Sequence, residues 1–230
     1  MKAAIELALI AVVVLACART AVPDKHVEEA VRLQKAGELA KEVEVLDKAA
    51  KEHPNRAKVH AYLGLYLGME AGQTHDFSAA GEFVRSAFAH LDQAVALDSS
   101  DSDARFFRGM LSVRVPDFFG KLEAGVRDLE FVLKHPGKRT KSDMDDRMVT
   151  TWSLLGTGYQ KQNQLDKAIA DFSAVIQLDP GNFSAYLQRG LAHDQKHNRD
   201  AALIDLRKAL TLAPTSGDKA AVQAELDRMK

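Results

Sequence analysis

Apolar residues follow two different patterns along the chain. Near the N-terminus they form one continuous run from Leu7 to Ala16, which gives way to a polar stretch at residues 19–26. Farther on they recur every three or four positions, and short polar breaks separate the periodic segments. This spacing places apolar side chains on one face of a helix. The body of the chain is therefore predicted to be a series of amphipathic helices.

Two consecutive segments, residues 149–182 and residues 183–216, share one length and one pattern. Each has an aromatic residue at its position 4, Gly at position 8, Ala at position 20 and Pro at position 32. The paired residues are Trp152 and Tyr186, Gly156 and Gly190, Ala168 and Ala202, and Pro180 and Pro214. Proline near the end of each segment stops a helix, because it cannot continue the hydrogen-bond ladder. A repeat of about this length indicates a repeat architecture.

The pattern resembles that of the tetratricopeptide repeat (TPR) family, W-x2-L-G-x2-Y…A-x3-F…P. The resemblance implies that each repeat is a pair of antiparallel helices, A and B, which approach closely at small residues. One such hairpin cannot bury its own apolar face, so several must stack. We therefore expect an all-α fold, a right-handed α-solenoid of about five helix-turn-helix repeats plus a C-terminal capping helix.

The same register extends upstream with insertions. From position 8 to position 27 the chain advances 19 residues between Gly190 and Ala209, but 30 between Gly64 and Ala94 and 23 between Gly109 and Val132. The second repeat therefore carries 11 additional residues and the third carries 4, and the polar stretch 134–147 separates the third from the fourth. The predicted repeats are residues 23–56, 57–101, 102–138, 149–182 and 183–216, with a cap over residues 217–230. Glu42 stands where the first repeat should have the alanine of position 20.

The N-terminal run is too short to span about 30 Å of hydrocarbon, and it is typical of a signal-peptide core. Cys17 follows Val14-Leu15-Ala16 at its end, which resembles the lipobox of bacterial lipoproteins, where the cysteine is lipidated and becomes the mature N-terminus. We therefore expect a signal peptide over residues 1–17 and the repeat domain over residues 18–230. Two alternatives stay open: ordinary signal cleavage, since Ala16-Cys17-Ala18 also fits that rule, and an N-terminal helix or anchor that is not removed.

Charge and cysteine content exclude several classes of function. The chain has 31 Lys and Arg against 32 Asp and Glu, without a sustained basic stripe, so nothing favours nucleic acid as a partner. One cysteine excludes an intramolecular disulfide framework and any metal site built on a cysteine pair.

Catalytic motifs are absent from the sequence, which has no G-x-S-x-G, P-loop, Rossmann fingerprint or H-E-x-x-H. We predict no enzyme activity and no cofactor. His193 and His197 form an H-x3-H pair on one helix face. His193 occupies a packing position of the repeat and His197 falls in the turn between helices, so we expect no metal site there.

The resemblance also implies a concave groove lined by the A helices. The residues that it places in this groove, as candidates for partner contact, are Leu65, Met69, Phe106, Met110, Gln160, Leu187 and Leu191. Exposed apolar patches often mark partner sites, and methionine adapts to varied shapes. The alternative is that the insertions or the cap cover these residues and make them core. The Lys and Asn that the family uses to clamp a C-terminal carboxylate are not in place, so no such capture is predicted.

The insertions are the second candidate region. One lies between Gly68 and Gly81, and the other contains Phe118 and Phe119. Long loops between packed helices are often functional. We expect these two phenylalanines either to reach the groove or a partner, or to fill the gap that the insertion makes.

The sequence thus predicts a non-catalytic scaffold of the bacterial cell envelope that binds a segment of a partner protein in the groove. It would be exported and anchored through a lipid on Cys17, on the periplasmic side. Ala18 after Cys17 favours the outer membrane in a Gram-negative cell. The alternative is a carrier or transporter-accessory protein, in which the insertions close the groove into a pocket for a small hydrophobic ligand.

Overall fold

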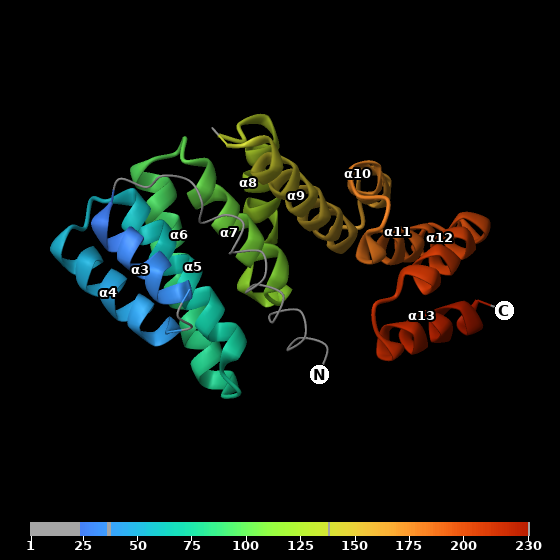
Figure 1. Cartoon of the computed structure of the whole chain (residues 1–230), viewed down its shortest axis with the longest axis horizontal. Coiled ribbons are helices and arrows are strands. Elements are labelled where there is room, and N and C mark those ends of the chain that lie inside the picture. Colours follow the sequence, from blue (N-terminus) through green and yellow to red (C-terminus); the bar gives the residue numbers. More distant parts are fainter. Residues whose placement is uncertain (1–23, 36–37, 138, 230) are drawn as a thin grey trace. The chain divides into compact units, whose positions relative to one another are not determined.

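The computed structural model describes residues 24–35, 38–137 and 139–229 (Figure 1). Within these ranges the chain forms eleven α-helices and one short 3-10 helix, and it has no strand. The predicted all-α class is therefore confirmed. Cys17 and the apolar run before it lie outside the described residues.

The chain divides into two compact units, and each is described by itself. Unit 1 comprises the described residues up to Met144, and unit 2 begins at Asp145. Helix α9 (Lys141–Lys161) starts just before this division and continues past it.

Unit 1 is a stack of helical hairpins. Helices α3 and α4 contact each other, as do α5 and α6, and α7 and α8, while α5 also contacts α3, α4 and α7. The bounds are α3 (Lys25–Lys35), α4 (Leu39–Glu52), α5 (Ala57–Gln73), α6 (Phe77–Leu97), α7 (Ser102–Arg114) and α8 (Leu122–Lys134). Helix α5 is thus the central element of the unit, and its residues from Val59 to Met69 are all buried.

Unit 2 continues the same architecture with shorter connections. It contains most of α9, followed by α10 (Leu165–Leu178), α11 (Phe183–Gln195), α12 (Arg199–Leu212) and α13 (Ser216–Arg228). Helix α11 contacts α10 and α12, and α13 packs on α12. The turns after α9 and α11 each contain a residue in the left-handed region, Asn163 at φ 57° and His197 at φ 61°. His197 therefore lies in the turn, as the sequence predicted.

The small residues of the A helices mark points of very close approach. A Cβ atom on Gly64 would lie 2.6 Å from Leu91 Cγ and 2.8 Å from the carbonyl oxygen of Ala87. On Gly156 it would lie 2.6 Å from the ring of Phe172. Such distances leave no room for a side chain, which is the packing that the repeat register predicts for position 8.

The insertion in the second repeat does not form the long loop that the sequence analysis expected. Helix α5 continues to Gln73 and α6 begins at Phe77, so only residues 74–76 connect them. The additional residues lengthen the two helices to 17 and 21 residues, against 13 or 14 residues in α11 and α12. The physical reason is that Val84, Phe88 and Leu91, which follow the insertion in α6, have helical spacing and are all buried, so their packing stabilises the whole helix.

The polar stretch between the third and fourth repeats is also partly helical. Helix α9 begins at Lys141 rather than near residue 149. Thr140 caps its first turn, since the backbone N–H of Asp143 donates to Thr140 Oγ1 at 3.2 Å, and Thr140 Oγ1 in turn donates to Asp143 Oδ2 at 2.6 Å. Among the described residues, no helix is both long enough and apolar enough to cross a membrane.

Candidate functional site

The groove residues predicted for unit 1 lie in its interior. Leu65 and Met69 on α5 are 4% and 6% exposed, and Phe106 and Met110 on α7 are 1% and 3% exposed. Helix α5 carries apolar residues around its whole circumference, and a helix of that kind is buried on every side. Its four neighbouring helices in unit 1 include α7, which carries Phe106 and Met110. In this structure these four residues are therefore core rather than an exposed partner surface.

A small cavity lies between α5, α6 and α7. Its volume is about 10 Å³, and its walls include Leu65, Leu91, Phe107, Met110 and Leu111. A volume of this order admits about one water molecule, and the apolar walls offer that water no partners. Phe106, Phe118 and Phe119 do not line it. This cavity is too small for the hydrophobic ligand that the carrier alternative requires.

The groove residues predicted for unit 2 lie closer to solvent. Gln160, Leu187 and Leu191 are all half-buried. Gln160 Nε2 donates to Gln195 Oε1 at 3.1 Å, so α9 and α11 lie side by side at this point. Leu191 is four residues before Gln195 and Leu187 is four before Leu191, which places all three on one face of α11. We call this surface, made by Gln160, Leu187, Leu191 and Gln195, the α9–α11 face.

The cap covers one end of the α9–α11 face only in part. Leu187 packs against the apolar cluster of α12 and α13, which includes Leu206, Val222 and Leu226. Arg228 at the end of α13 pairs with Asp194 on α11 at 2.5 Å. Leu187 therefore packs against the core, whereas Leu191, Gln160 and Gln195 are not among the residues that pack against that cluster.

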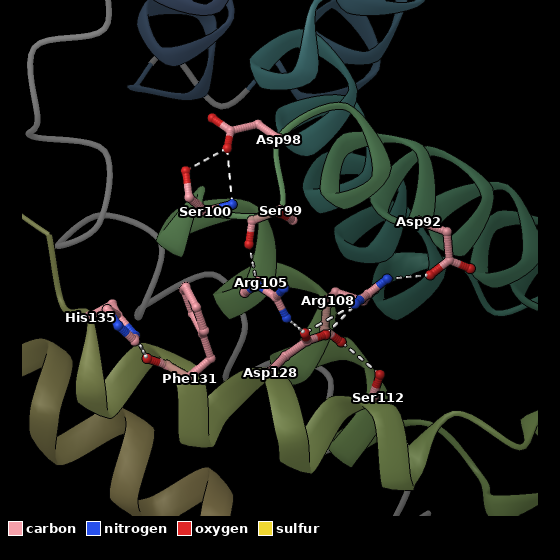
Figure 2. A network of polar contacts seen from close by, with 10 residues as sticks. All are labelled: Asp92, Asp98, Ser99, Ser100, Arg105, Arg108, Ser112, Asp128, Phe131 and His135. Carbon is pink, nitrogen blue, oxygen red and sulfur yellow. Dashed lines mark hydrogen bonds and ion pairs between the residues drawn. The ribbon is translucent and has the colours of Figure 1, made fainter.

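A polar network joins α6, α7 and α8 in unit 1 (Figure 2). Asp128 on α8 accepts from Arg108 Nε at 2.6 Å and from Arg105 Nη1 at 2.7 Å, both on α7. Arg108 Nη1 also donates to Asp92 on α6 at 2.9 Å. Burial opposes the charge of Arg108, but the hydrogen bonds and charges of Asp128 and Asp92 outweigh it and raise the pKa of Arg108 above its usual value. The network is an internal connection between helices.

The same connection recurs in unit 2. Arg189 on α11 donates to Asp205 on α12 through Nε at 2.8 Å and through Nη2 at 2.7 Å. Its Nη1 donates to Ser173 Oγ on the preceding helix α10 at 2.9 Å. Arg108 and Arg189 both directly precede the small residue of an A helix. Each arginine therefore joins its own B helix to the B helix of the repeat before.

Sequence reasoning missed these pairs, although a signal was present. Arg-Gly occurs at 108–109 and at 189–190, and an aspartate stands four residues before Val132 and four before Ala209. Reading both pairs in one repeat register would have placed each arginine opposite its aspartate.

In the second repeat a pair of histidines, His60 and His90, replaces the arginine–aspartate pair of the third and fifth repeats. His90 on α6 stands four residues before Ala94, where the third, fourth and fifth repeats have aspartate, and Leu63 precedes Gly64 in place of arginine. His60 Nδ1 lies 2.9 Å from His90 Nδ1. His60 Nε2 lies 3.0 Å from the carbonyl oxygen of Pro54, in the turn between α4 and α5.

The insertion of the third repeat forms an exposed loop. Phe118 is 74% exposed, and its ring stacks on that of Phe119 with centroids 4.7 Å apart. The 3-10 turn Asp117–Phe119 ends at Gly120, whose φ of 65° favours glycine. Phe118 therefore points away from the core, and Phe119 is half-buried beside it.

Possible metal ligands among the described residues do not form a metal-binding cluster. Within the described ranges, no group of three or more His, Cys, Asp or Glu side chains is arranged to hold a metal ion. His193 is half-buried on α11, and burial is the largest of the effects that lower its pKa.

Family models match the C-terminal part of the chain. Residues 156–196 match the model described as TPR repeat, and residues 183–216 match the model described as tetratricopeptide repeat. The cell division cycle protein 27 homolog of Caenorhabditis elegans is 33% identical over 73 residues, which are 32% of this chain and 9% of that protein. The tetratricopeptide repeat domain-containing protein PYG7, chloroplastic, of Arabidopsis thaliana is 31% identical over 77 residues, 33% of this chain and 26% of that protein.

The chain thus spans about a tenth and about a quarter of the length of the curated relatives that it matches. A crystal structure of MamA protein has the same fold, with a TM-score of 0.60 and 22% identity over 81% of this chain and 89% of that chain. Family models and fold together support the tetratricopeptide repeat family. Repeats of this family generally mediate protein–protein interaction and are generally non-catalytic.

Proposed function

We propose that this protein is a non-catalytic adaptor of the bacterial cell envelope that binds a segment of a partner protein on the α9–α11 face. The single observation that carries the proposal is the Gln160–Gln195 hydrogen bond, which sets two A helices side by side with half-buried Leu191 next to it. Leu191 offers apolar area, and the two amides offer further donors and acceptors for a peptide backbone.

The binding surface is smaller than the groove that the sequence suggested. Leu65, Met69, Phe106 and Met110 are interior, so none of them contributes to the binding surface in the proposal. Leu187 contributes through packing with the cap, and Leu191 contributes the accessible apolar contact.

Envelope location is the second part of the proposal, and it rests on the sequence of the N-terminus. The apolar run and Cys17 have the arrangement of a lipoprotein signal, and lipidation of Cys17 would hold the protein at the periplasmic side of a membrane. An inhibitor of lipoprotein signal cleavage should make the precursor accumulate in cells. If the wild type and a Cys17→Ser variant fractionate alike and no precursor accumulates, the lipid anchor is contradicted.

The adaptor function is tested by purification after crosslinking in cells. Wild type is compared with Leu191→Lys, which places a charge on the α9–α11 face, and with Ile204→Lys as matched control. Ile204 is 67% exposed on α12, so its replacement changes charge in the same unit without touching this face. A partner recovered by wild type and by the control, and lost by Leu191→Lys, supports the proposal. Equal recovery by all three chains contradicts it, provided circular dichroism shows equal helix content.

A further inference from the structure

The histidine pair of unit 1 has an unusual arrangement of protons. His60 is 3% exposed and contacts half-buried His90, with ring centroids 5.2 Å apart and an angle of 19° between the planes. The two Nδ1 atoms face each other at 2.9 Å, which is hydrogen-bond distance. One of them must donate and the other must accept.

The carbonyl of Pro54 decides which histidine donates. This oxygen can only accept, so His60 Nε2 at 3.0 Å must carry a proton. Gln93 Nε2 donates to the same oxygen at 3.0 Å, so the carbonyl is held from two sides. A neutral His60 then has its lone pair on Nδ1, and the proton between the rings belongs to His90.

The contact between the two rings can accept one positive charge and stay intact. A first added proton goes to His90 Nε2 and leaves the contact intact. A second must go to His60 Nδ1, where two N–H groups would face each other at 2.9 Å and the hydrogen bond would be lost. Double protonation therefore removes one of the contacts that hold α5 against α6.

A carboxylate on α4 acts on the histidine pair. Burial and the neighbouring His60 lower the pKa of His90, and Asp47 on α4 acts in the opposite direction. Asp47 also pairs with Lys51 at 2.5 Å, which offsets part of its charge. In the third and fifth repeats the corresponding contacts are arginine–aspartate pairs.

We propose that the His60–His90 pair is an acid-sensitive contact, and that double protonation loosens the α5–α6 hairpin while unit 2 keeps its structure. Leu65 and Met69 on α5 are interior when the contact is closed, and loosening the hairpin gives solvent access to them. The inference goes beyond the proposed adaptor function. Only its biological use, a response to the pH outside the cytoplasm, rests on the proposed export.

Hydrogen exchange of the full chain at pH 7.5 and pH 5.0, corrected for intrinsic exchange rates, tests the proposal. The background is Glu42→Gln, because Glu42 titrates near neutral pH. We expect peptides of α5 and α6 to exchange faster at pH 5.0 than at pH 7.5, by up to about tenfold. Peptides of α11 and α12 should keep their rates.

Two variants separate the pair from other acid effects. His90→Gln keeps an N–H donor for His60 without a titrating ring, so the acceleration should disappear. His75→Gln is the matched control, since His75 is exposed in the turn of the same hairpin, and the acceleration should remain. Equal rates at both pH values, or acceleration that persists in His90→Gln or extends equally to unit 2, overturns the proposal.

A measurement on the wild type does not depend on any variant. Nitrogen-15 spectra of the imidazoles should show His60 as the Nε2–H tautomer at pH 7.5. They should also show two separated titration steps for the pair. A His60 ring protonated on Nδ1 at pH 7.5 would contradict the assignment.

Discussion

Arg108 on α7 and Asp128 on α8 form a two-point ion pair whose carboxylate is only 1% exposed. The pair connects the two helices of one repeat, and the bond from Arg108 to Asp92 connects that repeat to the preceding one. Because Arg189, Asp205 and Ser173 repeat this geometry, the stack uses a recurring polar connection beside its small-residue contacts.

Removing the acid of this pair should be costly. Asp128→Ala leaves Arg105 and Arg108 without their buried partner, and we expect a loss of about 3–5 kcal/mol in the free energy of unfolding. The matched control is Arg127→Ala, which breaks the exposed pair with Glu123 and should cost less than about 1 kcal/mol. Urea unfolding followed by circular dichroism measures both. Equal costs would show that the network contributes little.

Glycine at position 8 should be irreplaceable where backbone crowds it. A Cβ on Gly109 would lie 2.7 Å from Leu129 Cγ and 2.9 Å from the carbonyl oxygen of Gly125. Gly109→Ala should therefore cost about 1–3 kcal/mol through overpacking. Gly81 lies within α6 with its nearest neighbour, Arg85 Nη1, at 3.5 Å, so Gly81→Ala should be neutral or gain up to about 1 kcal/mol. Thermal unfolding measures the stability of both variants. If Gly81→Ala is less stable than Gly109→Ala, the packing described here is wrong.

Phe106 is buried and Phe118 is exposed, so replacing each by alanine should change the free energy of unfolding by different amounts. Phe106 is 1% exposed, and Phe106→Ala should cost about 3–5 kcal/mol. Phe118 is 74% exposed, and Phe118→Ala should change the free energy of unfolding by less than about 0.5 kcal/mol. The pair of unfolding curves checks whether Phe106 is core. If Phe106→Ala lowers the free energy of unfolding only slightly, Phe106 lines an open groove and is not part of the core.

Glu42 should make stability fall as pH rises. Its side chain is 1% exposed, its Oε2 has no hydrogen-bond partner, and burial, with a smaller effect of Glu70, raises its pKa to about 7. The folded-state pKa lies above the unfolded value, so the fold favours the protonated form. This stability is complete below the unfolded value and is lost as pH rises through about 7.

Glu42→Gln tests that sign, because it keeps the shape of the side chain and removes its titration. The melting temperature of the variant should exceed that of wild type at pH 8, and the difference should shrink towards pH 5. His90 acts in the opposite sense, since its lowered pKa means stability is lost as pH falls below the free histidine value. A constant difference between Glu42→Gln and wild type across this range would mean that Glu42 does not titrate there.

The sequence allowed the repeat architecture to be predicted where the period is undisturbed. Gly156 and Gly190 fixed the register of the last two repeats, and the family models match that part of the chain. The insertions were harder, because residues 68–81 contain glycines and polar residues typical of loops. Helical periodicity in the segment that follows, through Val84, Phe88 and Leu91, was the better guide, since packing of an apolar face stabilises a helix more than local propensity does.

The site was less predictable than the fold. A family-wide groove position identifies the face of a helix, but not whether that face is covered. For α5 the sequence held a further signal, because Leu63 and Leu67 stand on the face opposite Leu65 and Met69, so the helix is apolar on both sides and is predicted to be buried all round. For Leu187 no such signal existed, since its contact with the α12–α13 cluster depends on where the cap packs.

The central claim, that the α9–α11 face binds a partner segment, is tested most directly by a photo-crosslinking amino acid placed at Leu191 and, separately, at Ile204. Both positions are in unit 2 and on adjacent helices, so each variant carries the same probe on a different surface. The account predicts a specific crosslinked protein from position 191 and none from position 204, after irradiation of living cells. The same product from both positions, or a product from position 204 alone, would contradict it.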